Sequence, residues 1–199
     1  MSDIIAIYGS PRRNGNTATL LKHAVSGAIH AGAVVEEFVL RDLKISPCME
    51  IYHCKKNGEC AIKDDFQKII NEIIKAQGLL IASPIFFYAV SAHTKAFMDR
   101  CQSAWVKKHW VNKGTKSSLN ISKKGIFISV GATQGKKLFD GAILSMRYFM
   151  ETLDITLIKS ICYRGLDHEG DILKHQDYLN NAYEVGYNLA KIVLKEKLQ

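Results

Sequence analysis

The segment from residue 4 to residue 17 constrains the fold more than any other part of this sequence. It starts with four apolar residues, Ile4-Ile5-Ala6-Ile7, which predict a buried strand, and it leads into an amphipathic helix expected at residues 16–31. The connection from Gly9 to Thr17 consists largely of glycines, hydroxyls, amides and arginines. In open α/β sheets, such connections lie at the carboxyl ends of the strands, where ligands bind.

The side chains of this connection suit a terminal phosphate group. Ser10, Asn16 and Thr17 can donate hydrogen bonds, and the backbone N–H groups at the helix start favour an anion together with the helix dipole. Arg12 can add a bidentate contact. The alternative interpretation is an ordinary polar turn between a strand and a helix.

Two common nucleotide-binding motifs do not fit the connection. In a Walker loop the two glycines are one residue closer than Gly9 and Gly15, and a lysine stands where this chain has Asn16. The G-x-G-x-x-G fingerprint is absent, and Arg12 and Arg13 would crowd a pyrophosphate that needs close backbone approach. The connection therefore predicts a site for one terminal phosphate.

The length and composition indicate one globular domain over residues 1–199. The chain has 199 residues, of which 47% are hydrophobic and 23% charged. No apolar run is long enough to span a membrane, and the first residues lack the basic region of a signal peptide. Five cysteines without an export signal suggest a reducing compartment, so we expect a cytoplasmic protein with no membrane partner.

Strand and helix patterns alternate along the chain and predict an α/β fold with a doubly wound, five-stranded parallel sheet. The run Gly78 to Ala82 is apolar throughout, as expected for a central strand covered on both faces. The expected strands are 3–8, 34–40, 78–82, 125–130 and 155–162, and the expected helices are 16–31, one opening at 64, 90–106, 136–152 and 171–197.

Three connections should share the carboxyl edge of this sheet: 9–17, 83–91 and 131–135. The second carries a run of large apolar residues where a loop is usually polar, which predicts contact with a flat apolar ligand or a partner subunit. The third is small and glycine-containing, so that backbone can approach a ring system closely. A phosphate, a polar chain and a planar ring system together describe flavin mononucleotide (FMN).

The chain resembles the flavodoxin-like NAD(P)H-dependent FMN reductase family, close to its iron–sulfur flavoprotein branch. The resemblance rests on Gly9 to Thr17, on Cys54 to Cys60 with Asp64 and Asp65, and on Ser83 to Tyr88 continuing to Thr94 through Arg100. It implies a strand order of 2-1-3-4-5. It also implies an FMN-dependent oxidoreductase that takes electrons from NADPH or NADH and passes them to a small acceptor, such as a quinone, a flavin, or a ferric, nitro or azo compound.

The resemblance assigns cofactor-binding roles to specific positions but no catalytic side chain, since the flavin carries the chemistry. The FMN phosphate would be held by Ser10, Arg12, Asn16 and Thr17. The isoalloxazine would be lined by Pro84, Ile85, Phe86, Phe87 and Tyr88, and its other edge would be covered by Gly131, Thr133 and Gly135. The long connections at 42–62 and 107–123 lead us to expect a homodimer or homotetramer.

The cysteine segment departs from the pattern of the iron–sulfur members, which is C-x2-C-x2-C-x5-C. Here Cys48, Ile51, Cys54 and Cys60 stand at those positions, and isoleucine cannot ligate iron. Three interpretations stay open: free thiols, a metal or cluster with an unusual fourth ligand, and a labile thiol pair such as Cys54–Cys60. We expect no metal here. Cys101 and Cys162 are expected in the core.

The net charge of +8 leaves two other functions to consider. An electron-carrier flavoprotein reduced by a protein partner is one, although such carriers are often acidic. A nucleic-acid-binding module is the other, based on a lysine-rich segment, but no recognition motif accompanies it, so we expect no nucleic-acid partner. The segment contains Lys107, Lys108, Lys113, Lys116, Lys123 and Lys124, and a solvated loop is the simplest interpretation.

Overall fold

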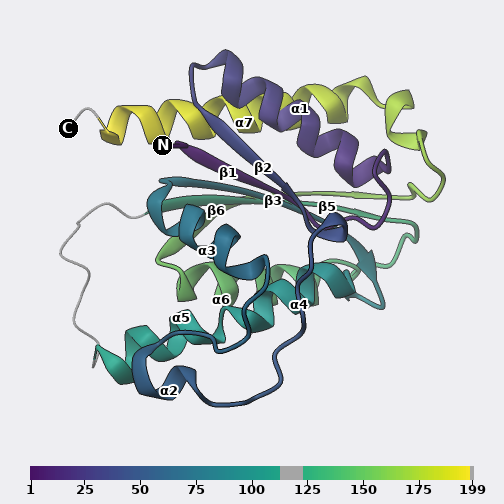
Figure 1. The fold of residues 1–199 in the computed structure, drawn as a ribbon. Coiled ribbons are helices and arrows are strands. Elements are labelled where there is room, and N and C mark those ends of the chain that lie inside the picture. The colour runs from purple at the N-terminus through teal and green to yellow at the C-terminus, as the bar shows by residue number, and fades with distance from the viewer. Residues whose placement is uncertain (113–122, 198–199) are drawn as a thin grey trace.

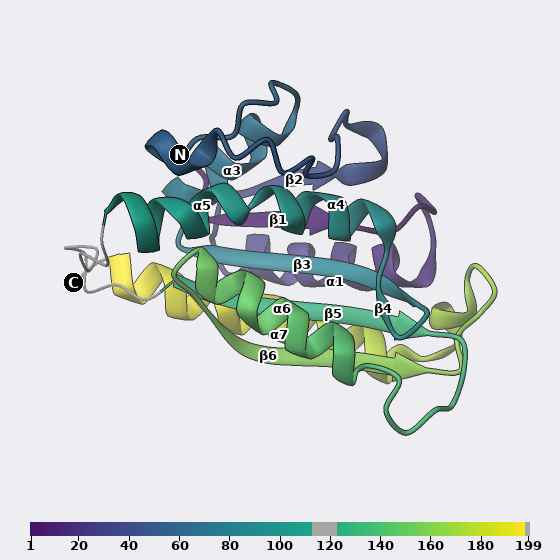
Figure 2. The ribbon, with the colours of Figure 1, turned by 90° about the horizontal axis from the view of Figure 1, so that it is seen from below.

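The computed structural model describes residues 1–112 and 123–197 and shows three layers, with helices on both faces of one sheet (Figure 1). Helices α1 and α7 cover one face, and α3, α4, α5 and α6 lie on the other, which faces the viewer in Figure 2. The strands are β1 (Ile4–Tyr8), β2 (Val35–Val39), β3 (Gly78–Phe86), β4 (Ala89–Val90), β5 (Lys123–Gly131) and β6 (Ile155–Arg164). The α-helices are α1 (Asn16–His30), α2 (Cys54–Asn57), α3 (Phe66–Lys75), α4 (Ala92–Arg100), α5 (Gln102–Val106), α6 (Asp140–Thr152) and α7 (Gln176–Lys197).

The sheet has the predicted topology. Its strands run in the order β2-β1-β3-β5-β6 and are parallel to their neighbours, so the five strands expected from the sequence follow the order 2-1-3-4-5. The short strand β4 was not expected. It pairs antiparallel with the end of β3 and forms a hairpin there.

The central strands are apolar throughout because their side chains alternate between two cores. In β1, Ile4 and Ala6 face the core under α1 and α7, whereas Ile5 and Ile7 face the core under α3, α4 and α6. In β3, Leu80 faces the core under α1 and α7, and Leu79 faces the other core. Two-sided burial of this kind requires the parallel, doubly covered sheet that the sequence predicts.

Several helices differ from their predicted bounds. The helix expected at 90–106 is divided at Cys101, where the backbone N–H bonds to Met98 three residues back, and a π-helical turn follows at Lys107–Val111. The last helix begins at Gln176 rather than at 171, after a 3-10 turn at Asp171–Lys174. There the Asp171 carboxylate accepts from the backbone N–H of His168, a local bond that competes with a longer helix. The helix expected at 136–152 begins at Asp140.

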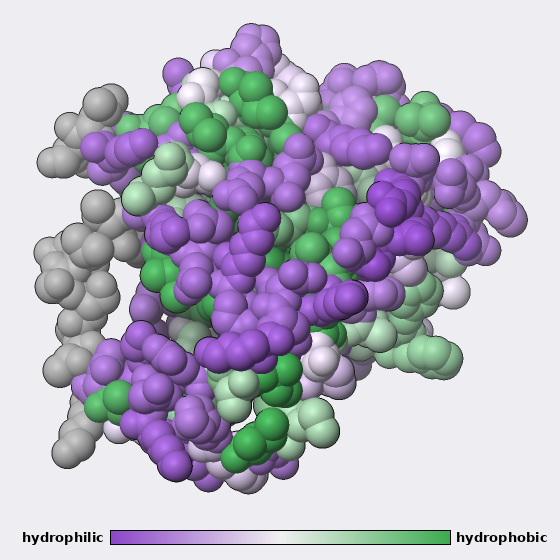
Figure 3. All heavy atoms as spheres, viewed as in Figure 1, coloured by the Kyte–Doolittle hydropathy of each residue, from purple (hydrophilic) through white to green (hydrophobic). Residues whose placement is uncertain are grey.

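The outer surface carries no continuous apolar region on the face shown in Figure 3. Apolar residues form separate green patches there between hydrophilic ones. Among the described helices, none combines the length and apolarity needed to cross a bilayer. Within the lysine-rich segment, Lys113 and Lys116 lie outside the described residues, while Lys108 pairs with Asp154 and Lys124 with Glu196.

Candidate functional site

The three predicted connections meet at the carboxyl ends of β1, β3 and β5, on the right-hand side of Figures 1 and 2. The backbone N–H of Gly9 donates to Ala82 O in β3 at 2.7 Å. The Ser129 hydroxyl in β5 donates to Ser83 O at 2.7 Å. These bonds hold the starting points of the three connections next to one another.

The connection after β1 leaves the first turn of α1 open to an anion. Its N-cap residue, Gly15, provides no side-chain cap, and the first turn carries no acidic residue. Ser10 and Thr17 are buried beside it, and the Ser10 hydroxyl accepts from the backbone N–H of Arg12 at 3.1 Å. Uncapped N–H groups at a positive helix end form an anion site unless another group satisfies them.

Two side chains that are predicted to bind the phosphate also form hydrogen bonds with other residues of the protein. The Asn16 amide donates to His168 O at 2.9 Å and accepts from the backbone N–H of Ile172 at 3.1 Å. Both functional groups of Asn16 therefore tie α1 to the segment that follows β6, while its second amide N–H and its backbone N–H are the donors left to offer an anion. Arg12 Nη1 donates to Asp167 O at 2.9 Å, which places the guanidinium at the same junction with other donors free.

A cavity of about 350 Å³ adjoins the phosphate loop on the side of β2. Arg12, Arg13 and Lys22 give it a basic rim. Inside it, the Tyr8 hydroxyl donates to the Glu37 carboxylate. Burial and this carboxylate raise the pKa of Tyr8, so the phenol stays protonated near neutral pH.

The residues predicted to line the ring system form a hairpin rather than a loop. β3 runs through Pro84 and Ile85 to Phe86, which pairs with Ala89, so that Phe87 and Tyr88 make a two-residue turn. Both turn residues have positive φ, 50° and 61°. Glycine or asparagine usually fills such positions, because the left-handed conformation is strained for bulky residues. The Phe87 side chain is fully exposed at 102%, whereas Tyr88 is 52% exposed.

The hairpin and the glycine connection contact each other through Tyr88. The Tyr88 hydroxyl lies 2.8 Å from the point that a Cβ on Gly135 would occupy. Arg164 fixes this connection from β6 by donating to Gly135 O at 3.1 Å. Thr133 is exposed, and buried Gly131 packs under Leu138, so the missing Cβ at Gly131 serves packing within the chain.

A buried chain of hydroxyls behind these connections was not anticipated. The Ser83 hydroxyl accepts from the backbone N–H of Ser91 at 2.9 Å, and the Ser91 hydroxyl donates to Gly9 O. The same Ser91 oxygen caps α4 by accepting from the backbone N–H of Thr94 at 3.2 Å. These side chains and Ser129 are 0–1% exposed. The sequence signal was available, because Ser91 and Thr94 have the spacing of a helix N-cap.

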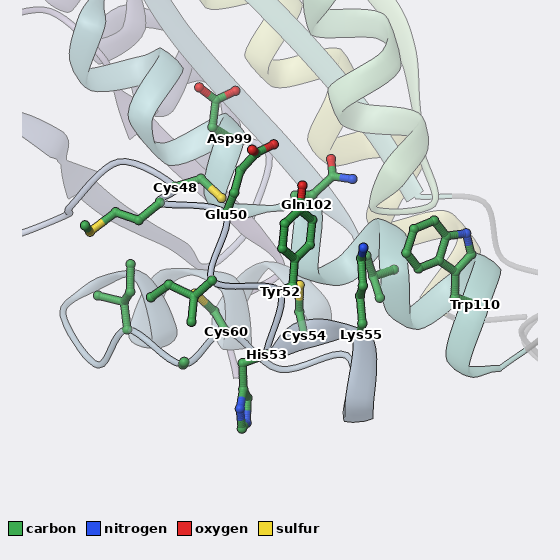
Figure 4. Close-up of a pocket in the computed structure, with 15 residues that line it drawn as sticks. Cys48, Glu50, Tyr52, His53, Cys54, Lys55, Cys60, Asp99, Gln102 and Trp110 are labelled. Atoms are coloured by element: carbon green, nitrogen blue, oxygen red, sulfur yellow. The ribbon is translucent and has the colours of Figure 1, made fainter.

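The cysteine segment lies outside this edge, beside α2 and α5. Cys48 is exposed and Cys54 and Cys60 are half-buried, and all three line a cavity of about 480 Å³ (Figure 4). Within residues 1–112 and 123–197, no three side chains of the metal-binding types are placed to hold a metal ion. The absence of a cluster stays a prediction. Cys101 is buried as expected, and Cys162 is half-buried in β6.

The edge of the sheet therefore combines an anion site, three exposed aromatic residues, Phe86, Phe87 and Tyr88, and a glycine connection. This combination fits a ligand with one phosphate and one planar ring, bound at the topological switch point of a flavodoxin-like sheet. The class is that of a flavin mononucleotide-binding α/β protein.

Comparison with known families agrees with this class. The family model described as NADPH-dependent FMN reductase matches residues 2–148, and the chain belongs to this family. The predicted membership of the NAD(P)H-dependent FMN reductase family is confirmed.

Individual relatives extend the comparison. An iron–sulfur flavoprotein from Methanocaldococcus jannaschii is 34% identical over 123 residues, 61% of this chain and 64% of that protein. The "Putative NAD(P)H-dependent FMN-containing oxidoreductase YwqN" of Bacillus subtilis is 32% identical over 179 residues, 90% of this chain and 93% of that protein. The chain spans 44–64% of the length of the iron–sulfur flavoproteins that it matches.

The solved structure of a flavone reductase superimposes with a TM-score of 0.72 at 20% identity, over 98% of this chain and 64% of the other. Such a likeness supports the fold.

Proposed function

We propose that this protein is an FMN-dependent oxidoreductase that takes electrons from NADPH or NADH and passes them to a small acceptor. When bound, FMN supplies the hydride and electron chemistry. The protein supplies binding and orientation, so the proposal concerns what its own residues hold. Residues 1–199 act as one FMN-binding domain in this proposal.

The phosphate end of FMN is assigned to the start of α1. Ser10 and Thr17 are the hydroxyl donors, and the uncapped backbone N–H groups after Gly15 are the main-chain donors. Arg12 contributes its remaining guanidinium N–H groups from the junction with Asp167. Asn16 contributes its backbone N–H and its second amide N–H, while its other amide N–H bonds to His168 and its amide oxygen to Ile172.

The ring of FMN is assigned to the space between the β3–β4 hairpin and the glycine connection. Pro84 to Tyr88 present the apolar and aromatic surface, and Thr133 and Gly135 present the other edge, with buried Gly131 beneath them at the end of β5. The Tyr88 side chain extends from the hairpin to the glycine connection, where its hydroxyl lies beside Gly135.

One observation carries the proposal: an uncapped helix start with buried Ser10 and Thr17 shares a sheet edge with an exposed aromatic hairpin. A phosphate site alone would fit many nucleotides. The aromatic hairpin adds the flat apolar surface that a flavin requires.

Arg12→Ala tests the phosphate assignment. We expect FMN affinity to fall by roughly 1.5–3 kcal/mol, or about ten- to hundredfold, the scale of a hydrogen bond to a charged group. Riboflavin lacks the phosphate, so its affinity should stay unchanged. Arg13→Ala is the matched control, because the Arg13 guanidinium pairs with Asp42 at 2.7 Å. Fluorescence titration measures the affinities of both variants and of the unaltered protein for FMN and for riboflavin. An equal loss for FMN and riboflavin in Arg12→Ala would contradict the role of the loop.

The electron donor, the acceptor and the oligomeric state are tested separately. Anaerobic bleaching of bound FMN by NADPH or NADH distinguishes this oxidoreductase from an electron carrier that is reduced by a protein partner. Quinones, flavins, ferric chelates, and nitro and azo compounds are the acceptor classes to assay. We also propose a homodimer or homotetramer in the cytoplasm, and light scattering that showed a monomer would contradict the oligomer.

A further inference from the structure

The cavity beside α2 and α5 has features of a binding site that the proposed function does not use. Its volume of about 480 Å³ falls within the range of small-molecule sites, about 300–1,000 Å³. Its lining combines aliphatic side chains, two aromatic rings and three thiols. Figure 4 shows Cys48 and Cys60 to the left, Cys54 below Tyr52, and Lys55 between Tyr52 and Trp110.

The loop that forms one wall of this cavity is strained. Glu50 and Tyr52 both line the cavity, and both have positive φ, at 49° and 59°. A left-handed conformation costs a residue with a side chain roughly 1–2 kcal/mol. Strain of this kind collects at ligand-binding segments, where surrounding contacts hold it in place.

Arg100 holds the chain on both sides of this loop and also fixes one thiol. The guanidinium is buried, and its five N–H groups are matched by five acceptors. Four of these acceptors are the two Asp64 carboxylate oxygens, Ser46 O and Ile62 O, at 2.7–3.2 Å. The fifth is the Cys60 sulfur, 3.2 Å from Nε. Cys60 is thus the one thiol of the three that a buried cationic group holds in position.

A second cationic group lies among the aromatic residues of the cavity. Lys55 Nζ lies 3.8 Å from the centre of the Tyr52 ring and 5.2 Å from that of Trp110. It can donate a hydrogen bond to an oxygen of a ligand in the cavity. The Glu50 carboxylate also lines the cavity and offsets the charge of Lys55, and Asp99 is paired with Lys95 at 2.7 Å, so a neutral ligand fits best.

We propose that this cavity binds planar α,β-unsaturated carbonyl compounds of the quinone type and that Cys60 adds covalently to them. The Cys60 sulfur bonds to the ring carbon β to a carbonyl, and the C=C electron pair moves toward that carbonyl oxygen, where Lys55 donates. The thiol proton ends on that oxygen. The hydrogen of the ring carbon that now bonds the sulfur then moves as a proton to the second carbonyl oxygen, so the ring becomes a hydroquinone thioether. No oxidant or reductant takes part.

The test uses the whole chain of residues 1–199 with oxidised FMN and without NADPH or NADH, so its outcome is independent of the proposed reductase activity. The probe is 1,4-naphthoquinone under anaerobic conditions, and the readout is intact mass followed by peptide mapping. We expect one adduct on Cys60, ahead of the more exposed Cys48, with a rate that reaches a plateau as the probe concentration rises. The plateau reports binding in the cavity before the covalent step.

Matched variants separate the residues. Cys60→Ser should abolish the fast adduct, whereas Cys48→Ser should leave it. Lys55→Met should slow the plateau rate about tenfold, whereas Lys56→Met, a neighbour outside the cavity lining, should not. Thermal melting checks that each variant is folded. Labelling of Cys48 or Cys54 first, a rate that rises linearly without a plateau, or equal effects at Lys55 and Lys56 would each overturn the proposal.

Discussion

The strained hairpin turn predicts opposite effects for two neighbouring substitutions. Phe87 and Tyr88 occupy left-handed conformations that glycine adopts without cost, so Phe87→Gly and Tyr88→Gly both remove strain. The two side chains differ in what else is lost. Phe87 is 102% exposed and contributes no burial in the isolated chain, whereas Tyr88 is 52% exposed and lies against Gly135.

The magnitudes decide the sign in each case. Relief of a left-handed conformation raises the free energy of unfolding by roughly 1–2 kcal/mol. The greater conformational freedom of glycine in the unfolded chain lowers it by about 0.5–1 kcal/mol. Phe87→Gly should therefore stabilise the ligand-free protein by about 0.5–1 kcal/mol. Tyr88→Gly also loses about 100 Å² of buried aromatic surface, worth about 2.5 kcal/mol, and should destabilise it by about 1.5–2 kcal/mol.

Urea unfolding of the ligand-free protein measures both effects as shifts of the midpoint at constant slope. Phe87→Ala is the control, because alanine keeps the strain and should change stability by less than about 0.5 kcal/mol. If Phe87→Gly is no more stable than Phe87→Ala, the strain argument fails. A gain in stability together with weaker FMN binding would show that the strained turn serves the ligand.

Three further predictions concern the cysteine segment and the buried pair of Arg100 and Asp64 beside it. Arg100→Leu leaves the Asp64 carboxylate without its partner and should cost about 3–5 kcal/mol in thermal unfolding, whereas Lys95→Leu, which breaks the exposed pair with Asp99, should cost less than about 1 kcal/mol. Burial opposes ionisation of Asp64, but the hydrogen bonds from Arg100 and from backbone N–H groups outweigh it and lower its pKa. The contribution of Asp64 to stability is therefore present above its unfolded pKa of about 4 and is lost as the pH falls through the lower folded pKa, a loss that should disappear in Asp64→Asn. Anaerobically purified protein should contain no [4Fe–4S] cluster, since Ile51 offers no ligand, and Ile51→Cys should permit reconstitution; iron and sulfide analysis that finds an intact cluster in the unaltered protein contradicts this expectation.

The layers and strand order could be predicted because they depend on local patterns. The apolar run Gly78 to Ala82 and the alternation of strands with helices permit few other folds. The position of the site followed from the topology, since the carboxyl ends of parallel strands share one edge. The two-residue turn at Phe87 and Tyr88 was missed because turn prediction relies on glycine, asparagine and aspartate, and this turn has none.

Side-chain partners that are distant in sequence could not be predicted. Asn16 bonds to His168 and Ile172, more than 150 positions away, so the sequence could not show that its amide joins α1 to this segment, and its role toward a ligand stays a prediction. The same applies to Arg100, whose acceptors lie 36–54 positions earlier. A pattern of residue types records which groups can bond, whereas the tertiary fold decides which of them meet.

The buried hydroxyls of Ser83, Ser91 and Ser129 have a consequence for how a ligand would bind. Because they join the ends of β1, β3 and β5 before any ligand arrives, the entropy of ordering these ends is lost during folding. A ligand then does not have to order them, and more of its contact energy appears as affinity. Removing one hydroxyl, far from any ligand atom, should therefore slow association as well as weaken binding, because the free protein would spend less time in the competent arrangement.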